Sequence, residues 1–272
     1  MWRPCLSSTL PSLVQPRVDP EQDTWTSVKQ TAVTGAVALA AKAYVSGLNS
    51  VTVFYRERLV EAVERRPSDQ GLLTLCNHIS ALDDPIALVP LVKPRWFLDS
   101  KRIRWTLCAA NRCFKNEVMS RFMEAARVIP VTRGLGVLQP GITAALARLH
   151  AGDWVHVFPE GRRSLSGDLL TTRYGVGKLI ADPAVTPIVI PYVHHGMQEI
   201  LPKGRTHLGL GHHLYILVGE PIDLSDILTK RFEHKRHLYR EVSDRVHVHL
   251  LKLQDQLQRM IEEYERNVPR GV

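Results

Sequence analysis

The stretch Leu72-Leu-Thr-Leu-Cys-Asn-His78-Ile-Ser-Ala-Leu-Asp83-Asp84-Pro85 changes character half-way along its length. Its first five residues form a mostly apolar run typical of a buried strand, and the polar residues that follow indicate a loop. Pro85 suits the first turn of a helix, which either Asp83 or Asp84 can cap. A strand, a loop and a helix in this order are the building unit of an α/β fold, whose ligand sites lie at the carboxyl ends of the strands. The stretch therefore predicts the fold class and places His78 at a candidate site.

The same alternation continues from about residue 70 to residue 225. Short apolar runs predict strands at Gly71–Cys76, Arg127–Val131, Trp154–Phe158, Ile188–Tyr192 and Leu214–Val218. Helical spacing of apolar residues predicts helices near Pro85–Val92, Asn116–Ala125, Ile142–His150 and Gly175–Ile180. We therefore expect an α/β domain with a central, mostly parallel or mixed sheet flanked by helices.

Helical segments precede and follow this domain. From Gln30 to Tyr55 apolar residues recur every three or four positions, but Lys42 interrupts the run. A helix in the membrane interface is therefore favoured over a spanning one, and a helix packed on its own domain is the alternative. After Pro221 the spacing predicts a long amphipathic helix with one apolar stripe, which consists of Leu238, Val242, Val246, Leu250, Leu253, Leu257, Ile261 and Tyr264.

These patterns divide the chain of 272 residues into four parts. We predict a flexible N-terminal tail at 1–24, a membrane-interface helical segment at 25–65, the α/β domain at 66–225 and a C-terminal helical extension at 226–272.

Composition and charge limit the class of protein. The chain is 44% hydrophobic and 23% charged, which excludes a disordered or fibrous protein. A net charge of +8 indicates an anionic partner, but the few aromatic residues and the scattered basic ones argue against nucleic acid. Four cysteines without a CxxC pair argue against a disulfide framework and a cysteine zinc site, and favour a reducing compartment.

His78 and Asp83 form a candidate catalytic pair. Their spacing places a carboxylate across a turn from the imidazole, where it can bind one ring nitrogen and leave the other free to act as a general base. In the alternative interpretation His78 only bonds to the loop and Asp83 only caps the helix.

Three further strand ends carry polar residues or proline. The strand Trp154–Phe158 runs into Pro159-Glu160-Gly161-Arg162-Arg163-Ser164, where Gly161 allows close backbone approach and arginine can bind phosphate. Arg133 follows the strand Arg127–Val131, and the strand Ile188–Tyr192 closes with Pro191. Neighbouring histidines such as His194 and His195 usually point apart, so no metal site is expected.

Together these motifs resemble those of the glycerophospholipid acyltransferases, the HxxxxD or PlsC-type family. The resemblance rests on Asn77-His78 with Asp83, on Arg133, on Phe158-Pro-Glu-Gly161 and on the strand closing with Pro191. The motif Gly152-Asp153-Trp154-Val-His-x-Phe-Pro-Glu-Gly161 is similar to the corresponding motif of the tafazzin-like branch.

The resemblance implies a reaction and roles for these residues. His78, held by Asp83, deprotonates the hydroxyl of a lysophospholipid, which attacks an acyl ester or thioester directly. Asn77, Arg133, Glu160, Gly161, Arg163 and Pro191 bind the substrates. The favoured acceptor is monolysocardiolipin, the acyl donor is a phospholipid or acyl-CoA, and no cofactor or metal is needed. The expected location is a mitochondrial membrane, with the endoplasmic reticulum or plasma membrane as alternatives.

One departure from the tafazzin pattern keeps other functions open. Arg163 and Ser164 match the Phe-Pro-Glu-Gly-Thr-Arg-Ser form of the wider family, with Arg162 in place of its threonine. Arg163 either binds a phosphate, as in acyl-CoA-dependent relatives, or faces solvent. The alternatives are an acyl-CoA-dependent O-acyltransferase of broader range, an N-acylphosphatidylethanolamine synthase, a hydrolase and a non-enzymatic lipid-binding scaffold.

Overall fold

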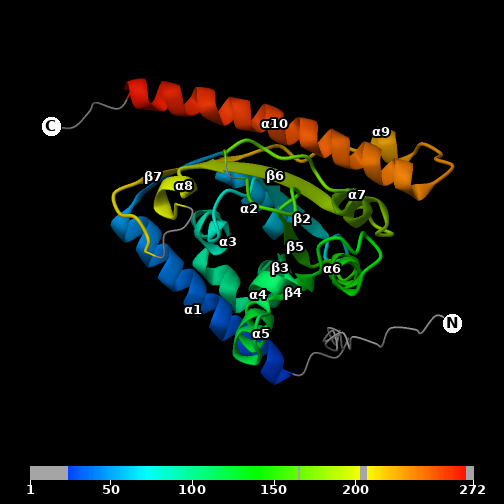
Figure 1. The fold of residues 1–272 in the computed structure, drawn as a ribbon, viewed down its shortest axis with the longest axis horizontal. Helices are drawn as coiled ribbons and strands as arrows, with labels where there is room; N and C mark the ends of the chain where they lie inside the picture. The colour runs from blue at the N-terminus through cyan, green and yellow to red at the C-terminus, as the bar shows by residue number, and fades with distance from the viewer. Residues whose placement is uncertain (1–23, 165, 203–206, 268–272) are drawn as a thin grey trace, which may run out of the picture.

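A computed structural model describes residues 24–164, 166–202 and 207–267 of the chain. Helices cover both faces of one seven-stranded sheet (Figure 1). The strands are β1 (Ser50–Phe54), β2 (Leu72–Cys76), β3 (Trp105–Ala109), β4 (Val128–Val131), β5 (Trp154–Val157), β6 (Ile188–His195) and β7 (His213–Val218). The α-helices are α1 (Thr24–Leu48), α2 (Arg56–Arg65), α3 (Asp83–Ile86), α4 (Ala110–Cys113), α5 (Glu117–Ala125), α6 (Pro140–His150), α7 (Tyr174–Ala181), α8 (Met197–Ile200), α9 (Ser225–Leu228) and α10 (Lys235–Asn267), and three short 3-10 turns, η1 (Val89–Leu91), η2 (Pro94–Leu98) and η3 (Ser100–Arg102), link α3 to β3.

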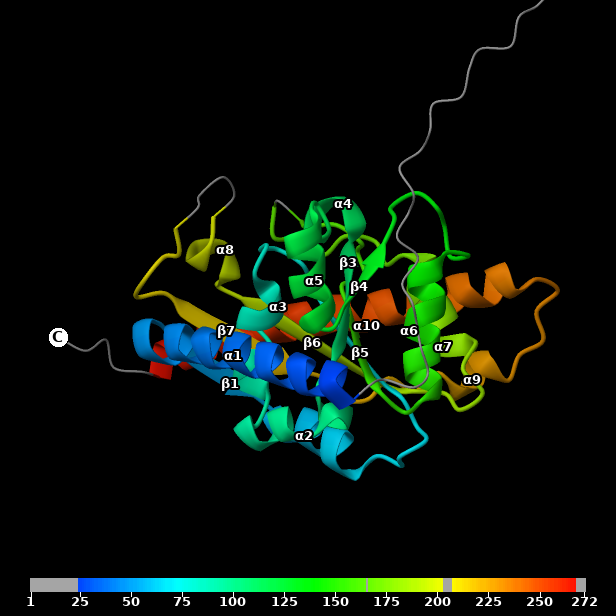
Figure 2. The ribbon, with the colours of Figure 1, turned by 90° about the horizontal axis from the view of Figure 1, so that it is seen from below.

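The sheet is mixed, with strand order β1-β7-β6-β2-β5-β3-β4. All neighbouring strands are parallel except β6 and β7, which are antiparallel. The predicted fold class is therefore confirmed. Because β2, β3, β5 and β6 run in the same direction, the segments after them lie at one edge of the sheet, where α4 and α8 are visible in Figure 2.

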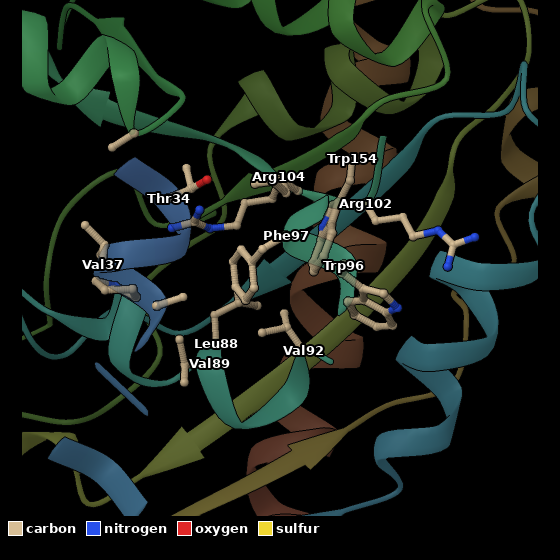
Figure 3. A pocket seen from close by; sticks show the side chains of 14 residues that line it. Thr34, Val37, Leu88, Val89, Val92, Trp96, Phe97, Arg102, Arg104 and Trp154 are labelled. Carbon is tan, nitrogen blue, oxygen red and sulfur yellow. The ribbon is translucent and has the colours of Figure 1, made fainter. Parts of the chain in front are cut away.

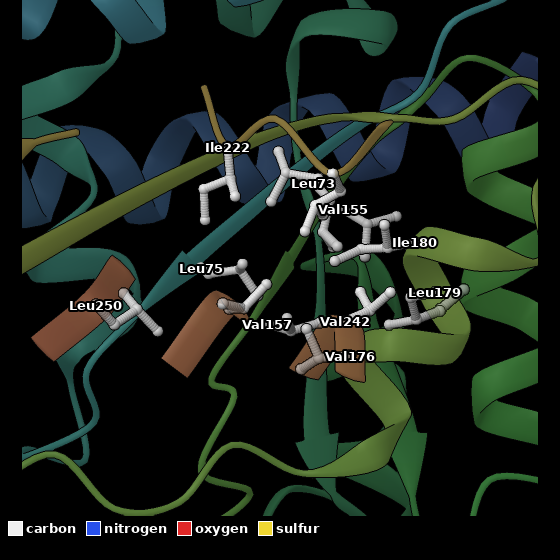
Figure 4. Close-up of a cluster of buried hydrophobic side chains, with 14 of the residues drawn as sticks. Leu73, Leu75, Val155, Val157, Val176, Leu179, Ile180, Ile222, Val242 and Leu250 are labelled. Atoms are coloured by element: carbon white, nitrogen blue, oxygen red, sulfur yellow. The ribbon is translucent and has the colours of Figure 1, made fainter. Parts of the chain in front are cut away.

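Side chains of each strand alternate between two apolar cores. Leu73 and Leu75 of β2 pack in the core under α6, α7 and α10, part of which is drawn in Figure 4. Leu72 and Cys76 point the other way, into the core under α1 and α2. A strand buried on both faces reads as a nearly continuous apolar run, which is why the sequence predicts β2, β5, β6 and β7 well.

The five predicted strands and the four predicted helical segments are all present, but the sequence analysis misses β1 and β3. The predicted helix through Tyr55 is wrong beyond Leu48, because Ser50–Phe54 forms β1 and pairs with β7. The proposed segment 25–65 thus contributes a strand to the central sheet. The predicted tail at 1–24 lies outside the described residues except for Thr24, and the other segment boundaries stay predictions.

Helix α1 packs on the domain along one face. Ala38, Ala41 and Val45 are buried against the core, whereas Val28 and Leu39 are exposed. By length and composition Val28–Leu48 can cross a membrane, a test that packed helices of soluble proteins and signal sequences also meet. The burial of one face favours a helix that lies on the domain.

The predicted C-terminal amphipathic helix is confirmed as α10, which packs on α7 and β6. Of the predicted stripe, Val242, Val246, Leu250, Leu253, Leu257 and Ile261 are buried, and Leu238 and Tyr264 are partly buried against the same core. One disulfide joins Cys108 of β3 to Cys113 of α4, a bond that the sequence analysis does not predict.

Candidate active site

The candidate catalytic pair of His78 and Asp83 comes together at the carboxyl end of β2, as the sequence predicts. His78 Nδ1 lies 2.9 Å from Asp83 Oδ2, and the Asp83 carboxylate is fully buried. The contact assigns the Nδ1 proton to a bond with the carboxylate, so His78 Nε2 carries a free lone pair. The His78 side chain is 17% exposed, which leaves room for a substrate hydroxyl to reach it. The pair thus has the geometry of a general base.

Two backbone amides also hold Asp83. Its Oδ2 atom accepts hydrogen bonds from Ile79 N at 2.8 Å and from Ser80 N at 2.9 Å. These bonds fold the loop between β2 and α3 back on the carboxylate. The prediction that Asp83 or Asp84 caps the helix is wrong, because α3 is a single turn without a side-chain cap. The carboxylate is used to orient the imidazole instead.

The segment after β5 supports His78 from the other side. Phe158 stacks on the imidazole, with ring centroids 4.0 Å apart. Glu160 accepts a hydrogen bond from His78 N at 2.8 Å and one from Leu170 N at 3.0 Å. Burial raises the pKa of Glu160 to about 7, although the two backbone bonds lower it. Ser164 N donates to His78 O at 2.7 Å, so this segment and the catalytic loop are bonded together at several points.

A second buried pair lies behind the catalytic loop. Arg104 binds the Asp84 carboxylate with Nε at 3.0 Å and also through Nη2. Burial alone would raise the pKa of Asp84, but Arg104 and His156 together lower it. The sequence analysis does not predict Arg104, since no motif marks it and only the fold brings it to Asp84.

His156 of β5 is fully buried beneath Phe158. Its Nδ1 atom lies 2.9 Å from Thr74 Oγ1, and its ring contacts the Phe158 ring edge-on at 4.9 Å. Burial lowers the pKa of His156 to about 4, so the ring is neutral near pH 7. His156 therefore supports the ring that stacks on His78.

The structure brings most of the other predicted site residues to the same edge of the sheet. Arg133 Nε donates to Gly161 O at 3.0 Å, and Gly161 has a φ of 66°, a conformation that favours glycine. Asn77 exchanges hydrogen bonds with the backbone of His194, which joins β2 to β6. Arg163 lies beside Asn77 in a cavity.

Pro191 is placed differently from the prediction. It is buried within β6, opposite Leu75, because the strand continues to His195 rather than ending at Tyr192. The pairing of β6 with β7 begins at Tyr192, one residue after Pro191. Proline has no N–H to donate to a neighbouring strand, so it is tolerated just before this pairing starts. His194 and His195, not Pro191, stand at the end of this strand, and a substrate-binding role for Pro191 stays a prediction.

Two cavities flank the site. A polar cavity of about 320 Å³ is lined by Asn77, Arg163, His194, Gln198, Gln254 and Gln258 together with neighbouring residues. An apolar cavity of about 40 Å³ lies between α1 and the α3–η2 segment (Figure 3). Its walls include Val37, Leu88 and Phe97, with Arg104 at one side. No group of three or more metal-ligating side chains gathers anywhere in the described part of the chain.

Comparison with known proteins agrees with this geometry. The family model "Acyltransferase" matches residues 57–194, which include the catalytic pair and the segment after β5. The chain belongs to the acyltransferase family. The fold of this acyltransferase is similar to the crystal structure of the 1-acyl-sn-glycerophosphate acyltransferase PlsC from Thermotoga maritima, with a TM-score of 0.57 at 18% identity over 89% of this chain and 83% of that one.

Curated relatives of this acyltransferase include tafazzins, so the tafazzin-like resemblance is confirmed. It is 34% identical to tafazzin of Drosophila melanogaster over 78% of this chain and 56% of that protein. It is also 37% identical to an N-acylphosphatidylethanolamine synthase of Arabidopsis thaliana, over 72% of this chain and 71% of that protein. The chain thus spans little more than half of the fly relative.

Proposed function

We propose that this acyltransferase transfers a fatty acyl chain to the hydroxyl of a lysophospholipid, with monolysocardiolipin as the favoured acceptor. The observation that supports the chemistry is the His78–Asp83 contact, since a protein that only binds lipid has no need of an oriented base. The similarity to tafazzins supports the acceptor.

The proposed reaction proceeds by direct attack. His78 Nε2 takes the proton of the acceptor hydroxyl while its oxygen attacks the acyl carbonyl carbon. The buried carboxylate of Asp83 stabilises the imidazolium that forms. The tetrahedral intermediate then collapses, the bond to the donor breaks, and the imidazolium returns the proton to the leaving alkoxide or thiolate. No cofactor and no acyl-enzyme take part in this scheme.

Arg133 and Arg163 are the proposed phosphate-binding groups. No carboxylate of the described residues pairs with the half-buried Arg163 or with the exposed Arg133, whereas Arg104 and most other half-buried cations have such a partner. Arginine binds phosphate oxygens in bidentate fashion and stays charged. Arg163 therefore supplies positive charge from within the segment from Phe158 to Ser164, and Arg133 supplies it beside Gly161, to whose carbonyl oxygen it donates.

The acyl chain of the donor is proposed to contact the apolar cavity beside α1. Pro85, two residues after Asp83, lies in its wall. The volume of about 40 Å³ accommodates a short part of a chain, so the rest extends along the outer surface.

Membrane attachment is proposed through the outer faces of α1 and α5, which pack side by side. Leu39 of α1 is 71% exposed, and α5 exposes Val118 and Phe122. Exposed apolar side chains on neighbouring helices favour contact with a bilayer. The test is sedimentation with liposomes of a double variant that carries both Leu39→Glu and Phe122→Glu. Leu210→Glu, at an exposed leucine before β7, is the control. Unchanged sedimentation of the double variant contradicts the proposal.

A mitochondrial membrane is the proposed location, with the endoplasmic reticulum and plasma membrane as alternatives. This assignment is supported by the resemblance to tafazzins alone.

N-acylation of phosphatidylethanolamine is the second candidate function, favoured by the 37% identity to the Arabidopsis synthase. The same base can deprotonate an amine, so the catalytic pair does not separate the two reactions.

Purified protein is to be tested for transfer from labelled phosphatidylcholine and, in parallel, from labelled acyl-CoA. The acceptors are monolysocardiolipin and phosphatidylethanolamine. We expect ester formation on monolysocardiolipin that falls by about 10²–10⁴-fold in His78→Ala and persists in the control His234→Ala, at an exposed histidine. Amide product alone favours the synthase, and release of free fatty acid without acceptor favours a hydrolase. Activity that survives in His78→Ala refutes the mechanism.

A further inference from the structure

The polar cavity beside the catalytic loop is lined in part by α8 and α10, which the proposed chemistry does not use. Its lining combines the ends of β2 and β6 with Gln198 of α8 and with Gln254 and Gln258 of α10. Its volume of about 320 Å³ far exceeds the roughly 10–15 Å³ that one water needs. Asn77, the residue before His78, lines the cavity, so the cavity adjoins the loop that carries the base.

His194 lines this cavity with a neutral ring. Its side chain is fully buried, and its Nε2 atom lies 3.1 Å from Asn77 O. A carbonyl oxygen can only accept, so Nε2 carries the proton and Nδ1 is a bare lone pair. Burial lowers the pKa of His194, which keeps the ring neutral. The neutral ring therefore adds no charge to the lining, and its Nδ1 atom is buried without a hydrogen-bond partner among the described residues.

The glutamines give the cavity neutral groups that both donate and accept. On α10, Gln254 is half-buried and Gln258 is exposed, beside Leu253 and Leu257, which are buried in the core. Gln254 Nε2 donates to Gly167 O at 3.1 Å, which leaves its amide oxygen as an acceptor. Gln198 Oε1 accepts from Gly196 N at 3.1 Å, and its Nε2 atom lies 3.4 Å from His195 Nε2, which leaves one of the two amide hydrogens to donate. Amides of this kind match hydroxyl groups, which also donate and accept.

The charged side chains of the described lining residues, Arg163 and Asp168, both come from the segment after β5. Arg163 lines the cavity, and the one carboxylate among the described lining residues is the exposed Asp168. A choline group carries neither an N–H nor an O–H, so it makes no hydrogen bond with the amides of this lining. A glycerol group with free hydroxyls supplies donors and acceptors together.

We infer that the polar cavity binds an uncharged, hydroxyl-bearing headgroup, such as the glycerol of a phosphatidylglycerol-type acceptor, with the adjoining phosphate against Arg163. The inference rests on the proposed function, because it names the part of the acceptor that this acyltransferase recognises. Gln254 and Gln258 are then specificity-determining residues rather than catalytic ones. They select the acceptor by its headgroup while His78 acts on its hydroxyl.

The test compares two acceptors in a double variant that carries both Gln254→Leu and Gln258→Leu. The full-length protein is assayed in mixed micelles with lysophosphatidylglycerol and with lysophosphatidylcholine. The lost hydrogen bonds are expected to reduce kcat/KM for the glycerol acceptor by about tenfold and to leave the choline acceptor unchanged. Gln256→Leu is the matched control, since Gln256 is on the same helix and outside the cavity lining. Circular dichroism and the thermal midpoint verify that the variants are folded.

A binding measurement separates this inference from the proposed function. Glycerophosphoglycerol and glycerophosphocholine are titrated into wild type and the double variant, and binding is followed by ligand-observed NMR. We expect wild type to bind the glycerol compound more tightly and the double variant to lose this preference. Binding without any acyl transfer would overturn the proposed function and keep the cavity assignment. Equal effects on both headgroups, or none on either, would overturn the cavity assignment.

Discussion

Replacing Asp83 by asparagine tests how the carboxylate contributes to the base. Asp83 Oδ2 accepts three hydrogen bonds, from His78 Nδ1, Ile79 N and Ser80 N. All three partners are donors, so they select the orientation in which the asparagine oxygen takes the place of Oδ2. The imidazole then keeps its tautomer and position. The variant removes only the negative charge that stabilises the imidazolium during the reaction.

The magnitude follows from Coulomb's law. The carboxylate and the imidazolium centre are about 4 Å apart, and at an effective dielectric constant near 20 their attraction is about 4 kcal/mol. Because about 1.4 kcal/mol corresponds to a factor of ten in rate, the loss of this attraction slows transfer by about 10²–10³-fold. Asp83→Ala, which also leaves three donors without a partner, is expected to be slower still and less stable.

The assay is the initial rate of acyl transfer by Asp83→Asn, Asp83→Ala and wild type at equal folded concentration. Asp255→Asn, at an exposed position of α10, is the control for the loss of one charge and should match wild type. A rate of Asp83→Asn within tenfold of wild type would show that the charge is unimportant. A rate of Asp83→Asn more than about 10⁴-fold below wild type would show that the asparagine does not keep the imidazole in place.

Three further outcomes follow from buried or half-buried groups. Arg104→Leu leaves Asp84 unpaired and should lower the free energy of unfolding, measured by urea titration, by about 3–5 kcal/mol. Arg121→Leu removes the exposed ion pair with Glu117, which contributes about 1 kcal/mol or less. An equally small loss in Arg104→Leu would contradict the prediction. The folded-state pKa of Glu160 is raised from 4.5 to about 7, so its proton stabilises the fold at low pH and this contribution is lost as pH rises from 4.5 through 7. Glu160→Gln should flatten that pH dependence, and parallel profiles would disprove the assignment. Val37→Phe narrows the apolar cavity and should reduce the ratio of long-chain to short-chain transfer by about tenfold, whereas an unchanged ratio would place the acyl chain elsewhere.

The sequence predicts the strands that are buried on both faces, and the catalytic pair at the end of one of them. It misses β1 and β3 for different reasons. Ser50–Phe54 follows the apolar helix α1 without a glycine or proline between them, so the helical spacing runs on into it. Trp105–Ala109 is preceded by three short 3-10 turns, whose sequence gives no regular period.

The site is predicted where a motif is local and missed where the fold assembles it. His78 and Asp83 are five residues apart, so one turn brings them together. Arg104 reaches Asp84 only because β3 lies two strands from β2, and His194 reaches Asn77 across a strand pair.

The pairing of β1 with β7 has a consequence for producing shortened forms of the protein. A chain that begins after Phe54, chosen to remove the apolar α1, would also strip β7 of its outer neighbour. The freed backbone N–H and C=O groups, together with the apolar side chains of Leu214, Ile216 and Val218, would form an open template for a strand from another molecule. Such a shortened chain is expected to aggregate through this edge, so a more soluble form should keep β1 and carry polar substitutions on the outer face of α1.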